Sequence, residues 1–226
     1  MTPSPHIDPQ TRFLHLPRGL ELELGLRLAP VTVAYRSWGR YDRRAGNAVL
    51  VCHALTGSAD LDRWWPELLG PGRALDPDRD LVICSNILGS CYGTTGPTSP
   101  REGSGRPWGP DFPQVTVRDM VRLQARLVDH LGIERLELVM GGSLGGMQAL
   151  EWAACFPERV GAVAAIATSG RHSPWCIGLS EAQRAAIRAD GRFREGRYDP
   201  RKPPAAGLAA ARMMAMCTYG APGGFA

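Results

Sequence analysis

The sequence predicts an α/β fold whose sheet is mostly parallel and begins with an antiparallel pair of strands at one edge. Three observations support this prediction. Residues 48–52 and 81–84 are short, continuously apolar runs, the pattern of parallel strands buried on both faces. Helical patterns alternate with apolar runs over residues 116–167. A glycine cluster at 141–146 joins one apolar run directly to a helical pattern, as in a strand–turn–helix unit.

The first elements are predicted to form the antiparallel pair. Residues 20–28 alternate leucine with mostly polar residues, which is the period of a strand with one solvated face. Ala29-Pro30 interrupts the alternation, and an extended pattern resumes over residues 31–38 until Gly39. We therefore expect 20–28 and 31–38 to pair with each other at the edge of the sheet.

A helix is predicted between the strand at 81–84 and the glycine cluster. Thr116 and Asp119 have the spacing of a capping box, which marks a helix N-terminus. Apolar residues follow at helical spacing, at Val117, Met120, Val121, Leu127, Val128 and Leu131. Gly132 ends the pattern, and an apolar strand at 136–140 follows. The order strand, helix, strand favours parallel neighbours in one sheet.

The central motif is the G-x-S-x-G sequence formed by Gly141, Ser143 and Gly145. It joins the 136–140 strand to a helical pattern at 148–156, the setting typical of a nucleophile elbow. Such a turn is too sharp for side chains beside the serine, and the two glycines let strand and helix approach closely. The alternative is a glycine-rich turn with an incidental serine, in a chain with 27 glycines. The flanking strand and helix favour the nucleophile.

The last predicted strand occupies residues 160–167, and long loops leave the carboxyl ends of three predicted strands, at 53–57, 86–112 and 168–174. Ligands of parallel α/β sheets gather at these ends. From residue 175 onward the pattern is helical and less apolar. We therefore predict a core domain at residues 1–174 and the beginning of a helical lid at residues 175–226.

Composition predicts a soluble globular protein. Hydrophobic residues make up 44% of the 226 residues and charged residues 21%. The amino terminus has no signal-peptide pattern and no run reaches membrane-span length, so we expect a cytoplasmic protein without membrane or nucleic-acid partners. The six cysteines have no metal-ligand or disulfide spacing. The net charge of +4 mildly favours an anionic ligand such as a nucleotide thioester, although a bias toward arginine explains it equally well.

Several segments together resemble the homoserine O-acyltransferase family of α/β-hydrolase-fold enzymes. The matching residues are 47–57, 70–72, 84–97, 108–113, 116–121, 141–148, 175–184, 207–213 and 218–219. The resemblance implies an α/β-hydrolase fold with a helical lid. It also implies acyl transfer from acetyl-CoA to the side-chain hydroxyl of L-homoserine, an early step toward methionine. Acetyl-CoA is then a co-substrate, with no bound cofactor or metal, and the full-length enzyme is expected to be a homodimer.

The resemblance also implies roles for individual residues. Ser143 is the nucleophile that forms an acyl-enzyme. The oxyanion hole consists of two backbone N–H groups, one from Leu144 and the other most readily from Leu55. His53 is expected to shape its loop rather than to act as the base, because the fold places the triad histidine last.

Two further residues are predicted in the substrate pocket, and two are not. Arg212 matches the family's arginine for the homoserine carboxylate, a ligand suited to the guanidinium fork. Tyr219 is a second candidate for this pocket, with a core tyrosine as the alternative. Trp64 and Trp65 lie beside the oxyanion loop and are expected to contribute packing rather than substrate contacts.

The chain departs from the family pattern in its catalytic triad and at its carboxyl-terminal end. In this fold the acidic residue and then the histidine of the triad follow the serine, and His172 comes too early for that position. Gly220 also stands where the family has an arginine. We therefore expect residues 1–226 to be an amino-terminal portion, with the triad acid and histidine beyond residue 226 and with little turnover on its own.

Other functions remain open from the sequence. Succinyl-CoA or serine can replace acetyl-CoA or homoserine in a related acyltransferase. A plain esterase is a third reading, although the Gly93–Pro97 loop segment and the Arg212 match argue against it. The fourth is a protein of this fold without catalytic activity.

Overall fold

The structure, a computed structural model, describes residues 7–220 and 222–225 of the chain, which divides into two compact units at residues 1–170 and 171–226. Strands of the first unit are β1 (Arg12–Leu16), β2 (Leu20–Glu21), β3 (Arg27–Leu28), β4 (Val31–Trp38), β5 (Ala48–Cys52), β6 (Leu81–Ser85), β7 (Leu136–Gly142) and β8 (Val160–Ile166). Its helices are α1 (Leu61–Trp64), α2 (Val117–His130) and α3 (Leu144–Cys155). The second unit contains α4 (Pro174–Ala189) and α5 (Ala205–Tyr219). Short 3-10 turns lie at Gly109–Asp111, Pro157–Arg159, Arg194–Gly196 and Pro222–Phe225.

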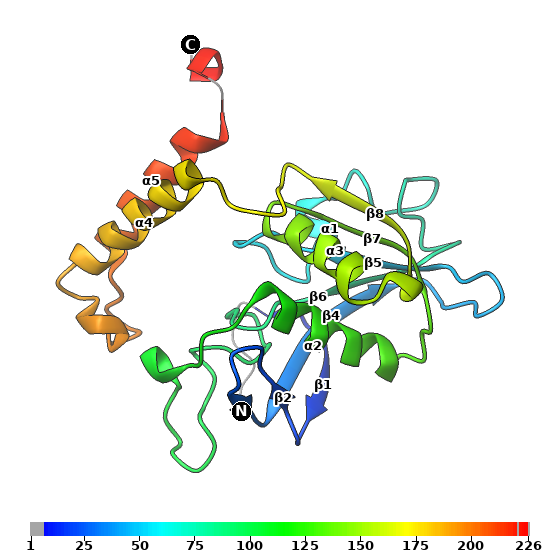
Figure 1. Ribbon diagram of the computed structural model, residues 1–226, viewed down its shortest axis with the longest axis horizontal. Coiled ribbons are helices and arrows are strands. Elements are labelled where there is room, and N and C mark those ends of the chain that lie inside the picture. Colours follow the sequence, from blue (N-terminus) through cyan, green and yellow to red (C-terminus); the bar gives the residue numbers. More distant parts are fainter. Residues whose placement is uncertain (1–6, 221, 226) are drawn as a thin grey trace. The chain divides into compact units, whose positions relative to one another are not determined.

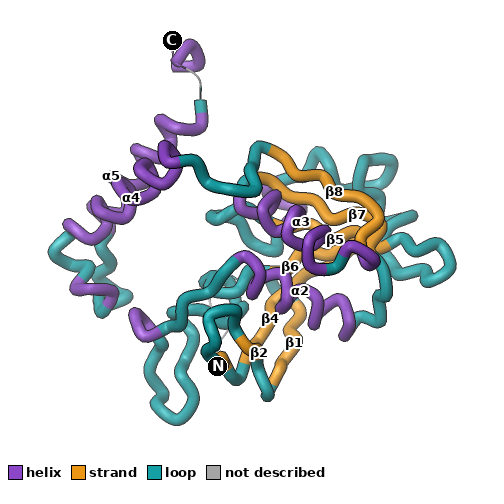
Figure 2. The backbone as a smooth tube through the Cα atoms, in the orientation of Figure 1, coloured by secondary structure: helices purple, strands orange, loops and turns teal. Residues whose placement is uncertain are grey.

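Six strands form one sheet in the order β1-β4-β6-β5-β7-β8 (Figure 2). The last four strands of this order are parallel, whereas β4 is antiparallel to both β1 and β6. The predicted α/β fold with a mostly parallel sheet and an antiparallel amino-terminal edge is therefore confirmed. The buried runs at 48–52 and 81–85 lie in the middle of the sheet, where both faces are covered.

The predicted partner of β4 was wrong. Residues 20–28 do not form one strand: β2 and β3 make a small hairpin of their own, pairing Leu20 with Leu28. Gly25 takes a φ of +84° within this hairpin, a conformation that favours glycine and ends the extended pattern. Instead β1, which the alternation analysis missed, pairs with β4 in register from Arg12 and Tyr35 to Leu16 and Val31.

Hydrophobic residues cover the sheet on both faces. Helices α2 and α3 lie on one face (Figure 1), where Leu127 and Trp152 pack with Leu50 of β5 in the main core. On the other face, Leu61 of α1 and the chain that follows it pack against Val51 in a second cluster. The predicted start of α2 is also confirmed, because the Thr116 and Asp119 side chains form a capping box at its amino terminus.

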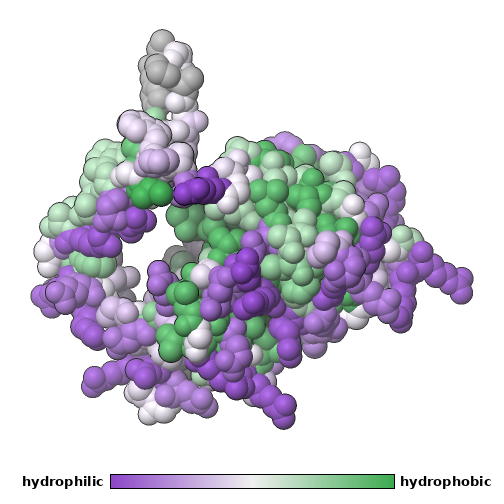
Figure 3. Space-filling view, in the orientation of Figure 1, coloured by the Kyte–Doolittle hydropathy of each residue, from purple (hydrophilic) through white to green (hydrophobic). Residues whose placement is uncertain are grey.

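The outer strand β8 is more exposed than its neighbours. Four of its seven residues are exposed, including Ile166, and the space-filling view shows apolar surface over this strand (Figure 3). None of the helices in the described part of the chain combines the length and apolar character that crossing a bilayer requires.

The second unit is a pair of packed helices. Gly207 of α5 makes the contact close: a Cβ atom there would lie 2.6 Å from the carbonyl oxygen of Ala186 in α4. Asp190, directly after α4, accepts a 3.0 Å hydrogen bond from the Gly207 N–H, so its carboxylate satisfies a donor in the first turn of α5. The helical pattern predicted from residue 175 onward is confirmed for these two helices.

Candidate active site

Ser143 lies on the turn between β7 and α3, as the motif predicts. Its backbone has φ 54° and ψ −120°, a region that residues other than glycine rarely occupy. The turn is held by its neighbours: the Ser143 N–H donates to the Ile166 carbonyl of β8 at 3.0 Å, and the Thr168 hydroxyl donates to the Ser143 carbonyl at 2.7 Å. The residue is exposed. A strained backbone that presents an exposed serine between strand and helix is the geometry of a nucleophile elbow.

Glycine is required two residues before and two residues after Ser143, because three pieces of backbone meet there. Gly141 of β7 is in register with Cys52 of β5. A Cβ atom on Gly145 would lie 2.0 Å from the Cys52 carbonyl oxygen, and one on Gly141 would lie 2.5 Å from the same oxygen. Such distances do not occur between real Cβ atoms and oxygen, so the close approach of strand and helix depends on these two glycines.

His53 follows β5 and is fully buried. Its Nδ1 donates to the Ala54 carbonyl at 2.7 Å, which leaves Nε2 as the acceptor of a 3.2 Å hydrogen bond from the Ile87 N–H. Burial lowers the pKa of His53, and the hydrogen bond to Ala54 opposes that shift only in part. With both ring nitrogens engaged, the neutral imidazole links the 53–57 loop to the chain after β6, in agreement with its predicted loop-shaping role.

The two predicted oxyanion donors, Leu144 and Leu55, come just after the carboxyl ends of β7 and β5, which are neighbouring parallel strands. Leu144 is the first residue of α3, where a backbone N–H has no partner within its own helix. Leu55 lies in the loop after β5, with 73% of its surface exposed. Their assignment as oxyanion donors stays a prediction, carried forward below.

Arg212 and Tyr219 lie in the second unit, on α5, rather than in the unit that carries Ser143. Both side chains are exposed. The Arg212 guanidinium donates to the Tyr219 hydroxyl at 3.5 Å, so the structure brings these two predicted residues together on one face of the helix. Their role in substrate binding stays a prediction.

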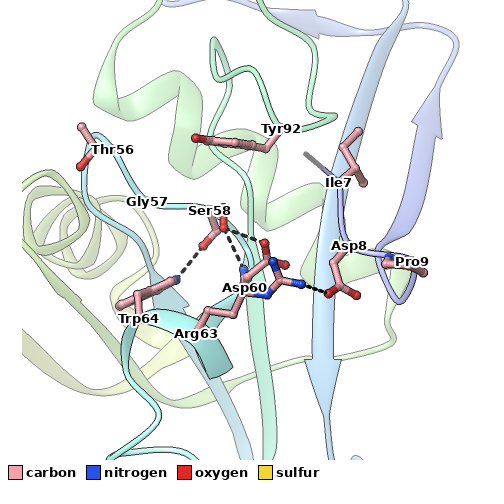
Figure 4. Close-up of a pocket in the computed structure, with 10 residues that line it drawn as sticks. All are labelled: Ile7, Asp8, Pro9, Thr56, Gly57, Ser58, Asp60, Arg63, Trp64 and Tyr92. Atoms are coloured by element: carbon pink, nitrogen blue, oxygen red, sulfur yellow. Dashed lines mark hydrogen bonds and ion pairs between the residues drawn. The ribbon is translucent and has the colours of Figure 1, made fainter. Parts of the chain in front are cut away.

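A pocket of about 430 Å³ lies beside the 53–57 loop, and motif analysis did not find it (Figure 4). Its walls come from residues 7–9, residues 56–64 and Tyr92. Trp64 lines the pocket, donates from Nε1 to the Ser58 carbonyl at 3.0 Å and packs in the second hydrophobic cluster. Its neighbour Trp65 packs there too, as predicted for both tryptophans. Three segments distant in sequence form this pocket, and no local pattern marks it.

Next to this pocket, Arg36 of β4 carries a buried charge. Its guanidinium is 3% exposed and donates to Asp60 at 3.2 Å and to both oxygens of Asp62. Asp8 lies 3.9 Å from the same guanidinium and pairs with Arg63 at 2.7 Å. The Gln10 N–H and the two arginines lower the pKa of Asp8. Each of the three carboxylates thus lies within ion-pair distance of a guanidinium group, and this cluster ties the amino-terminal segment to the loop after β5.

Within residues 7–220 and 222–225, no group of three or more histidine, cysteine, aspartate or glutamate side chains could hold a metal ion. The two buried thiols are also unsuited to be ligands or nucleophiles, because burial raises the pKa of Cys52 to about 12 and that of Cys84 well above its ordinary value.

Comparison with known proteins identifies the class. A family model described as alpha/beta hydrolase fold matches residues 47–222, a stretch that begins just before β5 and includes the nucleophile elbow. The chain therefore belongs to the α/β-hydrolase fold family.

Within that class, the chain is similar in sequence to curated homoserine O-acetyltransferases. It is 62% identical to a homoserine O-acetyltransferase of Trichormus variabilis, over 94% of this chain and 59% of the relative. The motif-based resemblance to homoserine O-acyltransferases is thereby confirmed. The chain spans about 60% of the length of the curated relatives it matches.

Solved structures give the same fold with two different activities in their names. The crystal structure of a homoserine O-acetyltransferase from Bacillus anthracis matches with a TM-score of 0.85 at 30% identity, covering 92% of this chain and 59% of that one. The crystal structure of esterase E22 also matches with a TM-score of 0.85, at 31% identity, covering 95% of this chain and 62% of that one.

Proposed function

We propose that this chain carries the nucleophile of a homoserine O-acetyltransferase, which moves the acetyl group of acetyl-CoA to the side-chain hydroxyl of L-homoserine in methionine biosynthesis. The observation that carries the proposal is the elbow. Ser143 takes a strained, exposed conformation between β7 and α3, in a chain that is 62% identical to a homoserine O-acetyltransferase. The proposed enzyme is cytoplasmic and, at full length, a homodimer.

The first proposed half-reaction acetylates Ser143. Its Oγ attacks the thioester carbonyl and gives up its proton to a base, the C–S bond breaks, and the CoA sulfur leaves with that proton. Negative charge develops on the carbonyl oxygen, where the Leu144 and Leu55 N–H groups are proposed to donate to it. We do not propose His53 as the base, because both its ring nitrogens are already hydrogen-bonded.

The second half-reaction delivers the acetyl group to homoserine. The substrate hydroxyl attacks the ester carbonyl, its proton leaves to the base, and the proton returns to Ser143 as the ester bond breaks. Arg212 is proposed to bind the homoserine carboxylate through its guanidinium fork, with Tyr219 beside it. Transfer succeeds only if the alcohol reaches the acyl-enzyme before water does.

The test measures release of free CoA thiol and formation of O-acetylhomoserine by the protein expressed from its complete gene. We expect Ser143→Ala to abolish both signals, since loss of the nucleophile removes the covalent route. Ser104→Ala, at an exposed loop position, is the matched control and should leave both unchanged. Full activity of the Ser143→Ala protein would overturn the proposal. Succinyl-CoA in place of acetyl-CoA, and serine in place of homoserine, test the donor and the acceptor separately.

A second candidate is an acyl-ester hydrolase. It is favoured by the match to esterase E22, which is as close in TM-score and identity as the match to the Bacillus anthracis transferase. The two functions differ in how the acyl-enzyme partitions. If acetate release to water is as fast without homoserine as O-acetylhomoserine formation is with it, the hydrolase is the better description. A rate of acyl consumption that depends on homoserine favours the transferase.

A further inference from the structure

Behind the nucleophile elbow lies a network of buried side-chain amides. Gln124 of α2 is 3% exposed and Gln148 of α3 is fully buried. The Trp152 Nε1–H donates to the side-chain oxygen Oε1 of Gln124 at 2.8 Å. The side-chain Nε2 of Gln124 in turn donates to Oε1 of Gln148 at 2.8 Å. The two glutamine amides are therefore aligned head to tail, an arrangement in which each hydrogen bond strengthens the next.

This network ends on the residue proposed to supply an oxyanion donor. The Gln148 amide donates to the carbonyl oxygen of Leu144 at 3.2 Å. Leu144 is the first residue of α3, whose N–H is proposed to face the reacting oxygen. A second hydrogen bond on the Leu144 carbonyl restrains the peptide groups of the first helical turn, and with them the direction of the N–H groups there.

A branch of the same network reaches the other proposed donor. The Gln124 amide and the Cys52 thiol lie 3.6 Å apart. Cys52 is the last residue of β5, immediately before the loop that carries Leu55, and its carbonyl oxygen faces Gly145 at the elbow. Gln124 thus contacts both β5, which leads into the loop of Leu55, and α3, which begins with Leu144. These are the two elements that position the proposed oxyanion donors.

Stability alone does not require these amides. Replacing both partners of a buried hydrogen bond by apolar groups of similar shape is often nearly neutral, whereas a satisfied polar network restricts the positions of the groups it joins. We propose that Gln124 and Gln148 are positioning residues that hold the Leu144 and Leu55 N–H groups in register for the developing oxyanion. This inference rests on the proposed function only in assuming an acyl-enzyme on Ser143.

The test is the rate at which an alkyl fluorophosphonate labels Ser143 in the protein expressed from its complete gene. This reagent phosphonylates an activated serine through a transition state whose oxygen occupies the oxyanion hole. Removal of one oxyanion donor typically slows a reaction about 100-fold to 1000-fold. Gln148→Met and Gln124→Met only shift the donor N–H groups, so we expect each variant to slow labelling about tenfold. The double variant should be slowed about as much as either single variant, since the two amides act as one unit.

The matched control is Asn47→Leu. Asn47 is also a buried amide, with three hydrogen bonds to backbone groups, but it lies before the amino end of β5, at the opposite end of that strand from the elbow. We expect it to lower the melting temperature without changing the labelling rate of the folded protein. The Michaelis constant for the acyl donor should stay unchanged in the glutamine variants, and the amide NMR signal of Leu144 should shift in them but not in the control.

Each outcome decides between the claims. Ser143-dependent labelling that is equally fast in the glutamine variants overturns the positioning role and leaves the proposed function intact. Absence of Ser143-dependent labelling in the unmodified protein overturns both. Labelling that is slowed as expected, in a protein that does not acetylate homoserine, supports positioning and overturns the substrate assignment. If the methionine variants do not fold, Trp152→Phe removes the donor to Gln124 together with part of a buried ring, and an unchanged labelling rate in the folded variant contradicts the inference.

Discussion

The turn at Ser143 and the Arg212–Tyr219 pair of α5 are held in different ways. At the turn, the backbones of β5, β7 and α3 meet so closely that a Cβ atom on Gly145 has no room. On α5, the predicted substrate residues are exposed and share one 3.5 Å hydrogen bond, while small residues such as Ala211 face the interior. Ser143 is therefore fixed by main-chain packing, whereas the two predicted substrate residues are joined to each other by a side-chain hydrogen bond. We expect substitutions at the turn to affect folding, and those on α5 to affect binding.

The largest expected effect is that of Gly145→Ala. The added methyl group would lie 2.0 Å from the Cys52 carbonyl oxygen, and both atoms belong to rigid elements, so strand and helix must separate. We expect a loss of at least about 3 kcal/mol of unfolding free energy, measured by urea denaturation. Gly178→Ala on α4, where a Cβ atom has open space, is the control and should gain about 0.5 to 1 kcal/mol. Equal stability of the two variants would mean that the elbow is not tightly packed.

A slightly smaller effect is expected from Arg36→Met. The variant keeps the length of the side chain but leaves Asp60 without its buried partner and Asp62 without its bidentate partner, whereas Asp8 keeps its ion pair with Arg63. Breaking a buried ion pair from one side typically costs about 3 kcal/mol, which denaturation measures. The control is Arg27→Met, whose partner Glu21 is exposed and whose loss should cost at most about 1 kcal/mol. A smaller loss at Arg36 than at Arg27 would contradict the structural role of the cluster.

Arg212→Met tests the other side of the comparison. If Arg212 binds the substrate carboxylate, its loss should lower kcat/KM for homoserine about 100-fold, because a charge-assisted bidentate contact is lost. The burst of CoA release on first acetylation should stay unchanged, and so should the melting temperature, since the side chain is exposed. Arg201→Met, on a neighbouring exposed segment, is the control. A reduced burst in Arg212→Met would place the arginine in donor binding instead.

The same contrast explains what sequence analysis could predict. The strands at 48–52 and 81–85 are buried along their whole length, and 136–142 is buried at four of its seven residues, so their apolar runs carry the information locally. The turn at Ser143 is likewise a local pattern of glycines. By contrast, β1 has the sequence RFLHL with only Leu14 buried, which leaves no clear period to detect.

Long-range features were not predictable in this way. The partners of Arg36 are Asp60, Asp62 and Gln10, each more than twenty residues away along the chain. The amides at Gln124 and Gln148 lie on two different helices and meet only after both have packed on the sheet. Helical periodicity places these residues on buried faces but cannot show which polar groups will satisfy one another. Site residues that depend on tertiary pairing therefore emerged only from the structure.

The smallest expected effect concerns Asp190, which joins the two helices of the second unit. Its pKa is lowered because its carboxylate accepts hydrogen bonds from the Gly207 and Arg192 N–H groups. A lowered pKa means that the stabilisation is present above the unfolded-state pKa of about 3.9 and is lost as pH falls below it. Amide hydrogen exchange at Gly207 should therefore become faster, relative to its intrinsic rate, between pH 4 and pH 3, whereas Asp190→Asn, which accepts without titrating, should show no such change. Asp190→Ala should exchange about fivefold faster at neutral pH, and exchange as slow as in the unmodified protein would show that close contact at Gly207, not the carboxylate, holds the start of α5.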